Sequence, residues 1–182
     1  DGITFDMQKL LLRKTQAEGD YHGVSSRFSA KLFTTITPVQ IDIGFNDIII
    51  PKPQLIQYPT LLDMPKPTLM GYTLETVVAE KLESVAKLAL ANTRMKDFYD
   101  LWTILKSYEV KRDQLHLTIQ KVFSHRKTPL KHPIAFTAEF YDNKETQQRW
   151  NNFLSNMGKR QIKLEDVISE LSNATSIFFK AD

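Results

Sequence analysis

The chain has 182 residues, of which 42% are hydrophobic and 25% are charged, and its net charge of +3 is too small by itself to indicate nucleic-acid binding. It contains no cysteine, which excludes disulfides and thiolate metal sites. No run approaches the ~18 apolar residues of a membrane span, so we expect a cytoplasmic protein with no membrane partner.

The first third of the chain reads as β-structure. It opens at Asp1 and enters a strand-like pattern almost at once, so we expect sequence upstream of it. Residues 22–34 and 38–45 alternate between apolar and polar side chains and predict two strands, with a turn at Thr34–Thr35. The dense prolines of residues 51–67 then favour extended segments and turns.

The remainder reads as helical. Thr73 is a candidate N-cap, and apolar residues recur after it with helical spacing. Further helices are predicted over residues 97–107, 113–124, 144–156 and 164–179. The sequence therefore predicts an α+β fold, with a β-rich lobe over residues 1–72 followed by an α-helical lobe over residues 73–182.

One lysine interrupts the apolar stripe of the first helix. Positions 74, 78, 81, 85 and 88 share one face, and four of them are leucine or valine, but the third is Lys81. Such a lysine extends to solvent, pairs with a carboxylate, or binds an anionic ligand. The first two outcomes are the commoner ones, because lysine is seldom buried unpaired.

A dense group of charges opens the next helix. Asp97 and Asp100 are neighbours on a helix, and Lys96 is four residues from Asp100 and able to pair with it. Arg94 could hold a carboxylate or a phosphate. Capping and surface ion pairs explain Asp97 well and Asp100 less well, so a structural role and a functional site both stay open.

Two other features could carry chemistry. Asp42 projects from the strand that holds Ile41 and Ile43 on its other face, and a rigidly placed carboxylate suits Mg²⁺, although it could equally be an ordinary solvent-facing residue. Residues 106–131 hold seven cations and two acids, which could follow a phosphate backbone or form a solvated basic face.

Three stretches together resemble a known family. QIDIGFND, YPTLLDMPKP and YTLETVVAEKLESVAKLALANTRMKDFYDLW are similar to the AbiEii/AbiGii-type nucleotidyltransferase toxins of type IV toxin–antitoxin and abortive-infection systems. The resemblance implies a polymerase-β-like nucleotidyltransferase lobe followed by a helical lobe. It also implies a role for six residues: Asp42 as a metal ligand, Lys81 and Arg94 as nucleotide-binding residues, and Lys96, Asp97 and Asp100 as the catalytic motif, with its final acid as the base.

The resemblance also implies Mg²⁺ as cofactor, an NTP as substrate, RNA (often tRNA) as acceptor, and a cognate antitoxin as partner. The sequence departs from the family in one respect: it contains no Asp-x-Asp pair after a Gly-Ser or Gly-Gly turn. We therefore expect that the intact protein is a nucleotidyltransferase and that this chain alone is inactive.

Two other functions stay open. One is a non-catalytic module that binds a nucleotide, RNA or protein. The other is a metal-dependent nuclease using Asp42 and Lys81, which is disfavoured because Lys81 is expected on a helix.

Overall fold

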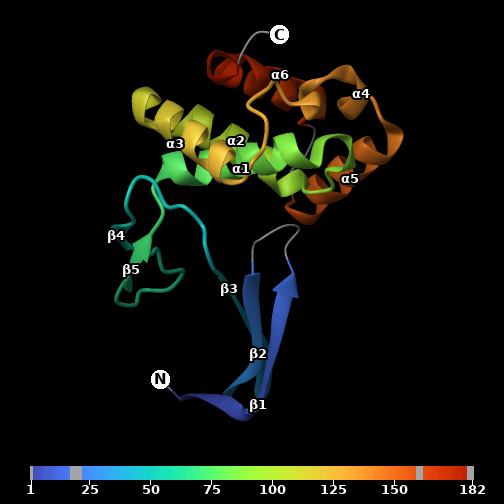
Figure 1. Cartoon of the computed structure of the whole chain (residues 1–182). Coiled ribbons are helices and arrows are strands. Elements are labelled where there is room, and N and C mark those ends of the chain that lie inside the picture. The colour runs from blue at the N-terminus through green and yellow to red at the C-terminus, as the bar shows by residue number, and fades with distance from the viewer. Residues whose placement is uncertain (1, 17–21, 159–161, 180–182) are drawn as a thin grey trace. The chain divides into compact units, whose positions relative to one another are not determined.

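The computed structural model describes residues 2–16, 22–158 and 162–179, and the chain divides into two compact units, Asp1–Asp47 and Ile48–Asp182. Each unit is described by itself (Figure 1). Strands come first and helices follow, so the predicted α+β class is confirmed. The predicted lobe boundary after residue 72 precedes the first helix by one residue, and as a domain boundary it stays a prediction.

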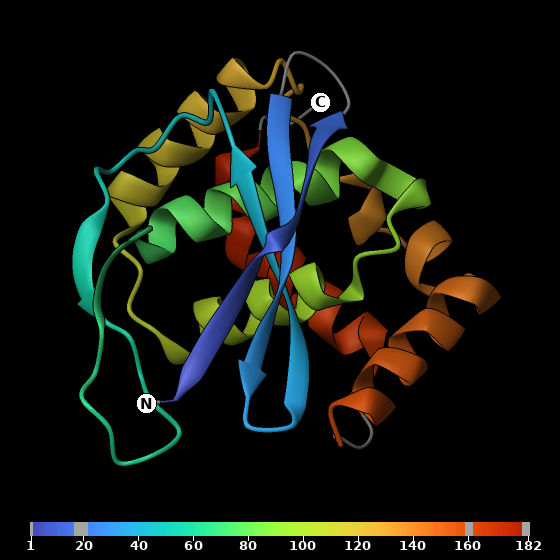
Figure 2. The same cartoon turned by 90° about the horizontal axis from the view of Figure 1, so that it is seen from below.

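The first unit is an antiparallel meander of three strands. β1 (Ile3–Gln16), β2 (His22–Leu32) and β3 (Thr35–Gly44) are hydrogen-bonded in that order (Figure 2). The turn between β2 and β3 lies at Phe33 and Thr34, one residue before the predicted turn. The register places Ser25 of β2 opposite Asp42 of β3, so the polar residues of neighbouring strands share one face.

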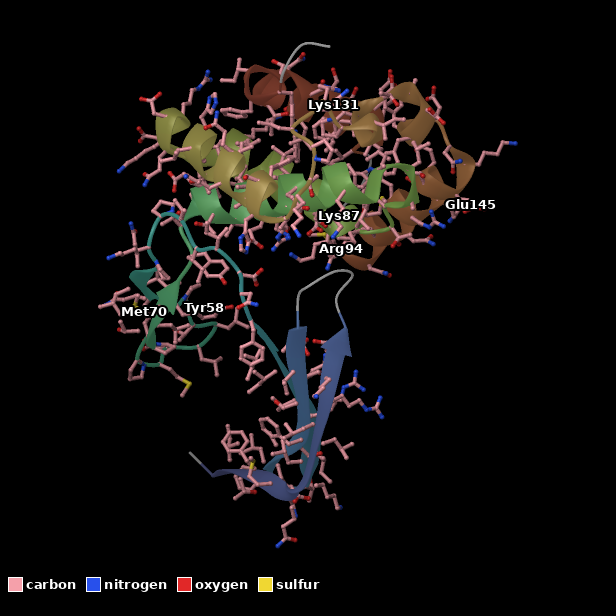
Figure 3. All side chains as sticks on the ribbon, viewed as in Figure 1. Tyr58, Met70, Lys87, Arg94, Lys131 and Glu145 are labelled. Carbon is pink, nitrogen blue, oxygen red and sulfur yellow. The ribbon has the colours of Figure 1, made fainter. Side chains whose placement is uncertain are left out.

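The proline-rich segment forms a small hairpin. β4 (Gln54–Gln57) and β5 (Thr68–Gly71) pair antiparallel, which the sequence predicted only as extended chain. A Cβ on Gly71 would lie 2.6 Å from Cδ1 of Ile56, so a larger residue there would force the Ile56 side chain to move. The apolar side chains of the hairpin, among them Tyr58 and Met70, are exposed (Figure 3).

Six α-helices follow in the residues that the structure describes. The first, α1 (Leu74–Leu88), begins where predicted, because the Oγ1 atom of Thr73 accepts a hydrogen bond from the backbone N–H of Thr76 at 3.4 Å. The others are α2 (Met95–Ser107), α3 (Arg112–His125), α4 (Ala138–Tyr141), α5 (Lys144–Asn156) and α6 (Leu164–Thr175), with 3₁₀ turns at Ala89–Ala91, Ile134–Phe136 and Ser176–Phe178. None of the helices in the described part of the chain has the length and apolar composition to cross a membrane.

The hydrophobic core lies among these helices. α1 packs against both α2 and α3 and contributes the fully buried residues Val78, Leu82 and Val85. Phe98 of α2 stacks on Phe140 of α4 with 5.2 Å between ring centroids. Each large apolar side chain buried this completely contributes roughly 1.5–3 kcal/mol. The consequence for function is that α1 and α2 are held firmly, so polar side chains on them have fixed neighbours.

Candidate functional site

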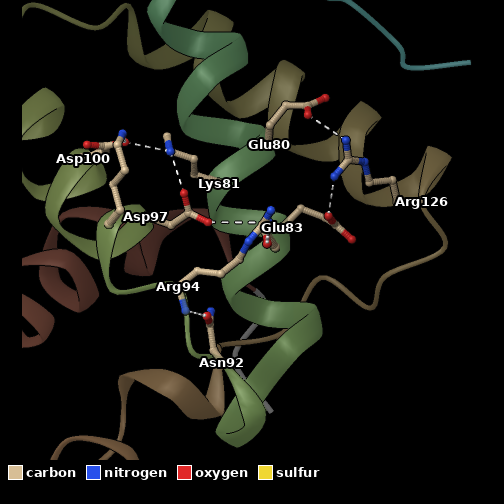
Figure 4. Close-up of polar contacts among 10 residues, drawn as sticks. Glu80, Lys81, Glu83, Asn92, Arg94, Asp97, Asp100 and Arg126 are labelled. Atoms are coloured by element: carbon tan, nitrogen blue, oxygen red, sulfur yellow. Dashed lines mark hydrogen bonds and ion pairs between the residues drawn. The ribbon is translucent and has the colours of Figure 1, made fainter. Parts of the chain in front are cut away.

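Lys81 lies between two carboxylates of α2. Its Nζ atom donates to Oδ1 of Asp97 at 2.6 Å and lies 2.8 Å from Oδ2 of Asp100 (Figure 4). The side chains of Lys81, Asp97 and Asp100 are 21%, 14% and 23% exposed, so the three charges are largely withdrawn from water but not sealed from it. Of the outcomes open to Lys81, pairing with carboxylates is therefore the one observed.

The turn before α2 sets this geometry. The side-chain Oδ1 of buried Asn92 accepts a hydrogen bond from the backbone N–H of Arg94 at 2.8 Å. This contact fixes the chain just before α2 starts, and Arg94 itself makes no side-chain cap. Asp97 and Asp100 then lie three residues apart on one helical face and meet α1 together. Asp97 stands in the first turn, where the helix dipole favours it, but its side chain is directed to Lys81.

Two exposed cations flank the carboxylates. Nζ of Lys96 lies 2.5 Å from Oδ2 of Asp100, as the four-residue spacing allowed. Nη1 of Arg94 donates to Oγ of Ser84 at 3.0 Å and lies 3.7 Å from Oδ2 of Asp97. Their side chains are 71% and 62% exposed, so both can reach a ligand from solvent. With three cations and two carboxylates, this group, which we call the Lys81 cluster, has one excess positive charge.

Hydrogen bonds and charges within the Lys81 cluster keep Lys81 and Asp100 ionised. Burial acts to raise the pKa of Asp100, but hydrogen bonds from Lys81 and Lys96 and the charges of both ammonium groups hold that pKa below its ordinary value. Burial acts to lower the pKa of Lys81, and its hydrogen bonds to Asp100 and Asp97 raise that pKa overall. At neutral pH Lys81 is therefore protonated and Asp100 is ionised.

Asp42 lies on the polar face of the first unit. Nε2 of Gln40 donates to both of its carboxylate oxygens, at 3.0 and 2.9 Å, and Nε of Arg27 donates to Gln40 at 2.7 Å. Hydrogen bonds from Ser25 and Gln40, with the charge of Arg27, outweigh a smaller effect of burial and hold the pKa of Asp42 below its ordinary value. These residues line a cavity of about 310 Å³ together with Arg13 of β1.

The described residues fit a metal ion only in part. Within residues 2–16, 22–158 and 162–179, no three His, Cys, Asp or Glu side chains are gathered closely enough to hold one. Mg²⁺ is usually held by one or two carboxylates together with water and substrate phosphates, and Asp42 alone supplies one. Asp42 belongs to one unit and Lys81 and Asp100 to the other, so a single site that contains all three, as the family resemblance implies, stays a prediction.

A second ionic group on α1 was missed by the sequence analysis. Glu83 is 1% exposed; its Oε2 accepts from Nη1 of Arg126 at 2.9 Å, and Thr128 donates to its other oxygen. Nη2 of Arg126 also donates to Glu80 at 2.6 Å. Figure 4 shows this Glu83 cluster on the other side of α1 from Lys81. The spacing of Ala79, Glu83 and Ala86 marks Glu83 as an acid on a helical face of small apolar residues, a signal that could have found it.

The basic segment of residues 106–131 is partly neutralised. Nζ of Lys106 lies 3.0 Å from Oε2 of Glu170, and Arg126 binds Glu80 and Glu83. Three acids outside the segment therefore compensate part of its positive charge.

Comparison with known proteins identifies a matching family. The family described as "Nucleotidyl transferase AbiEii toxin, Type IV TA system" matches residues 2–169, which is most of the chain. Neither a curated protein nor a solved structure matches. The matched range includes Asp42, the Lys81 cluster and the Glu83 cluster. The chain therefore belongs to the AbiEii family of nucleotidyl transferase toxins of type IV toxin–antitoxin systems.

Proposed function

We propose that this chain is part of a nucleotidyltransferase that moves a nucleotide from an NTP to an RNA acceptor, and that the Lys81 cluster binds the nucleotide and carries the base. The observation that supports the proposal most directly is the position of Lys81 between Asp97 and Asp100. A cation with two carboxylate neighbours can exchange one anionic partner for another at small cost, because the carboxylates keep Arg94 and Lys96 when it leaves.

In the proposed reaction, Lys81 and Arg94 hold the phosphates of the NTP. A hydroxyl oxygen of the acceptor attacks the α-phosphorus, the new O–P bond forms, and the bond to the pyrophosphate oxygen breaks. Asp100 accepts the hydroxyl proton, and pyrophosphate leaves with the bonding electrons. The cations balance the negative charge that develops on the phosphate oxygens.

Nucleotide binding and base strength are coupled in this arrangement. While Lys81 contacts Asp100, the low pKa of that carboxylate makes it a weak base. When Lys81 turns to the phosphates, Asp100 loses one of its two hydrogen-bonded ammonium groups and its pKa rises. Lys96 keeps the carboxylate of Asp100 in place. The base therefore gains strength when substrate is present.

The remaining parts of the proposal follow the family. Asp42 is proposed as one ligand of a catalytic Mg²⁺, which would neutralise phosphate charge when bound, and the Asp-x-Asp ligands are expected outside residues 1–182. Because one protein carboxylate holds Mg²⁺ weakly, residues 1–182 alone are expected to bind nucleotide without transferring it. A cognate antitoxin is the expected protein partner, and a tRNA end the expected acceptor.

The test uses the full-length protein, labelled NTPs and a pool of small RNAs. Asp100→Asn is expected to lower incorporation by roughly 10²–10⁴-fold while NTP affinity is unchanged or higher, since Lys81 loses a competing carboxylate. Asp113→Asn, an exposed acid in the first turn of α3, is the matched control and should leave both quantities unchanged. Full incorporation by Asp100→Asn would overturn the assignment of the base.

The second candidate function is a module that binds a nucleotide or RNA without turnover. It is favoured by the incomplete metal-ligand set of the described residues. NTP binding by wild-type full-length protein that depends on Lys81, with no incorporation under any acceptor or metal condition, would support this function instead.

A further inference from the structure

The cavity in the three-stranded sheet of the first unit holds two arginines beside Asp42. Its volume is about 310 Å³, and its lining includes Arg13 of β1, Arg27 of β2 and Asp42 of β3. All of its lining residues belong to one compact unit and to the described part of the chain, and Asp42 is the only carboxylate among them. A cavity of this size can take a small ligand or part of a larger one.

The strand register brings these side chains together. Arg13 lies opposite Ser25, and Ser25 lies opposite Asp42, so one row of side chains crosses all three strands. Arg27 is two residues after Ser25 on β2 and therefore shares its face. Arg13 and Arg27 are thus diagonal neighbours, which lie about 7–8 Å apart in an antiparallel pair. Side chains as long as that of arginine can close on a single group from these positions.

The carboxylate of Asp42 is already hydrogen-bonded, while most N–H groups of the arginines are not. Both oxygens of Asp42 accept from Nε2 of Gln40, and Oε1 of Gln40 accepts from Nε of Arg27 at 2.7 Å. That contact restrains the guanidinium of Arg27 and leaves its two terminal amino groups without a hydrogen-bond partner in the described ranges. Arg13 is exposed and likewise has no hydrogen bond or ion pair to any residue that the structure describes. The cavity therefore presents donors of two guanidinium groups to an anion.

The character of the lining narrows the choice of anion. Two arginines outweigh one carboxylate, so positive charge is in excess, and guanidinium groups bind phosphate in a bidentate way. Leu11 lies opposite Arg27, lines the same cavity and is 58% exposed. A phosphate that carries a sugar would cover this leucine, whereas a bare inorganic ion would leave it in water. The lining therefore suits a nucleotide unit better than free phosphate.

We propose that Arg13 and Arg27 bind a backbone phosphate of the RNA acceptor next to Asp42; the identity of the acceptor rests on the proposed function. In that function Lys81 and Arg94 hold the phosphates of the NTP, so the acceptor is the substrate that still lacks cations. A phosphate held here places the acceptor beside the carboxylate that is proposed to bind Mg²⁺.

The simpler alternative is a solvated basic face that binds nothing in particular. It explains Arg13, which is exposed and unpaired within the described residues. It does not explain why the guanidinium of Arg27 is oriented by Gln40, the same side chain that donates to Asp42. An oriented guanidinium loses less freedom when it binds a phosphate, which favours a binding site.

The test measures binding of a fluorescent single-stranded RNA to the full-length protein by anisotropy, in EDTA and without NTP, at several salt concentrations. Arg13→Gln is expected to bind RNA roughly tenfold more weakly, because a charge-assisted contact is lost. Its slope of log affinity against log salt should be smaller by about 0.7, the contribution of one single-strand phosphate contact. Arg13→Lys keeps the charge but not the bidentate geometry, so it should keep the slope and lose only part of the affinity.

The matched control removes one charge from the same face of the same unit. Lys31 is exposed and lies four residues after Arg27 on β2, roughly 13 Å along the strand. Lys31→Gln should leave the RNA affinity and the salt slope unchanged. Equal weakening in Lys31→Gln and Arg13→Gln would overturn the site in favour of general charge attraction.

Two further variants test the charge balance of the cavity. In EDTA, Asp42→Asn should bind RNA at least as tightly as wild type, because the carboxylate repels a phosphate when no metal is present; weaker binding would contradict a phosphate beside Asp42. If Arg13→Gln melts early, Leu11→Glu replaces it, because the new carboxylate opposite Arg27 should weaken RNA binding more than Leu11→Gln does. Equal RNA affinities of the two Leu11 variants would also overturn the site.

The outcomes separate this proposal from the proposed function. Asp100→Asn should bind RNA as wild type does, because Asp100 does not line the cavity. RNA binding that depends on Arg13 stands even if no nucleotide incorporation is ever found. If Arg13→Gln binds RNA normally but binds the NTP more weakly, the cavity holds the triphosphate and its assignment to the acceptor is wrong.

Discussion

The two ionic clusters on opposite sides of α1 both pair cations with two carboxylates but differ in how their charges are shared. In the Glu83 cluster, a carboxylate that is 1% exposed depends on Arg126 and Thr128. In the Lys81 cluster, each carboxylate has a second cation, and those cations, Lys96 and Arg94, are exposed.

The difference determines what each cluster can do. Removing Arg126 leaves a buried charge without a cation, so the Glu83 cluster resists change and joins α1 to the segment after α3. Moving Lys81 leaves both carboxylates partly paired, so the Lys81 cluster can admit a ligand. The same ion-pair chemistry is therefore structural on one side of the helix and available for binding on the other.

The largest expected effect is a loss of stability when the Glu83 cluster is disrupted. Arg126→Ala should lower the free energy of unfolding by roughly 3–5 kcal/mol, since it leaves the carboxylate of Glu83 buried without its cation. Thermal and urea unfolding measure this loss. Arg149→Ala is the matched control: its partner Glu145 is 78% exposed, so the change should be under about 0.5 kcal/mol. Equal losses in the two variants would remove the contrast between the clusters.

The next effect is on activity. Lys81→Ala should lower nucleotide incorporation by the full-length protein by about 100-fold or more, and weaken NTP binding. The free energy of unfolding should fall by only about 1 kcal/mol, because Asp97 keeps Arg94 and Asp100 keeps Lys96.

Lys106→Ala provides the control for that variant, because Lys106 is another ion-paired lysine on a helix of the same unit. It should change neither activity nor stability appreciably. If Lys81→Ala lowered the free energy of unfolding by several kcal/mol and the folded fraction kept its activity, the Lys81 cluster would be structural, like the Glu83 cluster.

A smaller effect concerns pH. The folded pKa of Asp100 lies below its ordinary value of 3.8, so its stabilisation is complete above about pH 4 and is lost as the pH falls through the lower folded value. The folded pKa of Lys81 lies above 10.5, so its stabilisation is complete below that pH and is lost as the pH rises through the higher folded value. Melting temperatures of wild type, Asp100→Asn and Lys81→Ala should therefore differ by constant amounts between pH 5 and pH 10. A difference that varies near pH 5 would contradict the shift of Asp100, and one that varies near pH 10 would contradict the shift of Lys81.

The smallest effect lies in the backbone at the end of α1. Ala89, at the end of α1, has φ of 48° and ψ of −129°, a conformation that favours glycine. Ala89→Gly should raise the free energy of unfolding by up to about 1 kcal/mol and leave nucleotide and RNA binding unchanged. A loss of NTP affinity in this variant would show that the turn itself helps to position Lys81.

Much of the fold was predictable because its signals are local. The cap at Thr73, the helix at residues 144–156 and the alternation of β3 depend on nearby residues alone. The two strands of the hairpin were not predicted, since four-residue strands among prolines carry little pattern. The Glu83 cluster was missed because its partner is 43 residues away in sequence.

The residues of the candidate site were predicted from the sequence, but the contacts among them were not. The interruption of an apolar stripe identified Lys81, but periodicity cannot tell a carboxylate neighbour from a ligand. The sequence analysis treated those two as alternatives, and the structure places two carboxylates against Lys81 without deciding against a ligand. Asp42 lies in the predicted strand, but its metal-binding role depends on residues that no local pattern supplies.

The short loop that joins α1 to α2 has a consequence for how the protein folds. The residues of the Lys81 cluster lie within twenty positions of one another, from Lys81 to Asp100, so their contacts are of low sequence separation. Contacts of this kind form early, since little chain entropy is lost in closing them. The α1–α2 hairpin can therefore bring Lys81 to its carboxylates before the distant Arg126 reaches Glu83. Hydrogen exchange during refolding should protect α1 and α2 before the C-terminal end of α3.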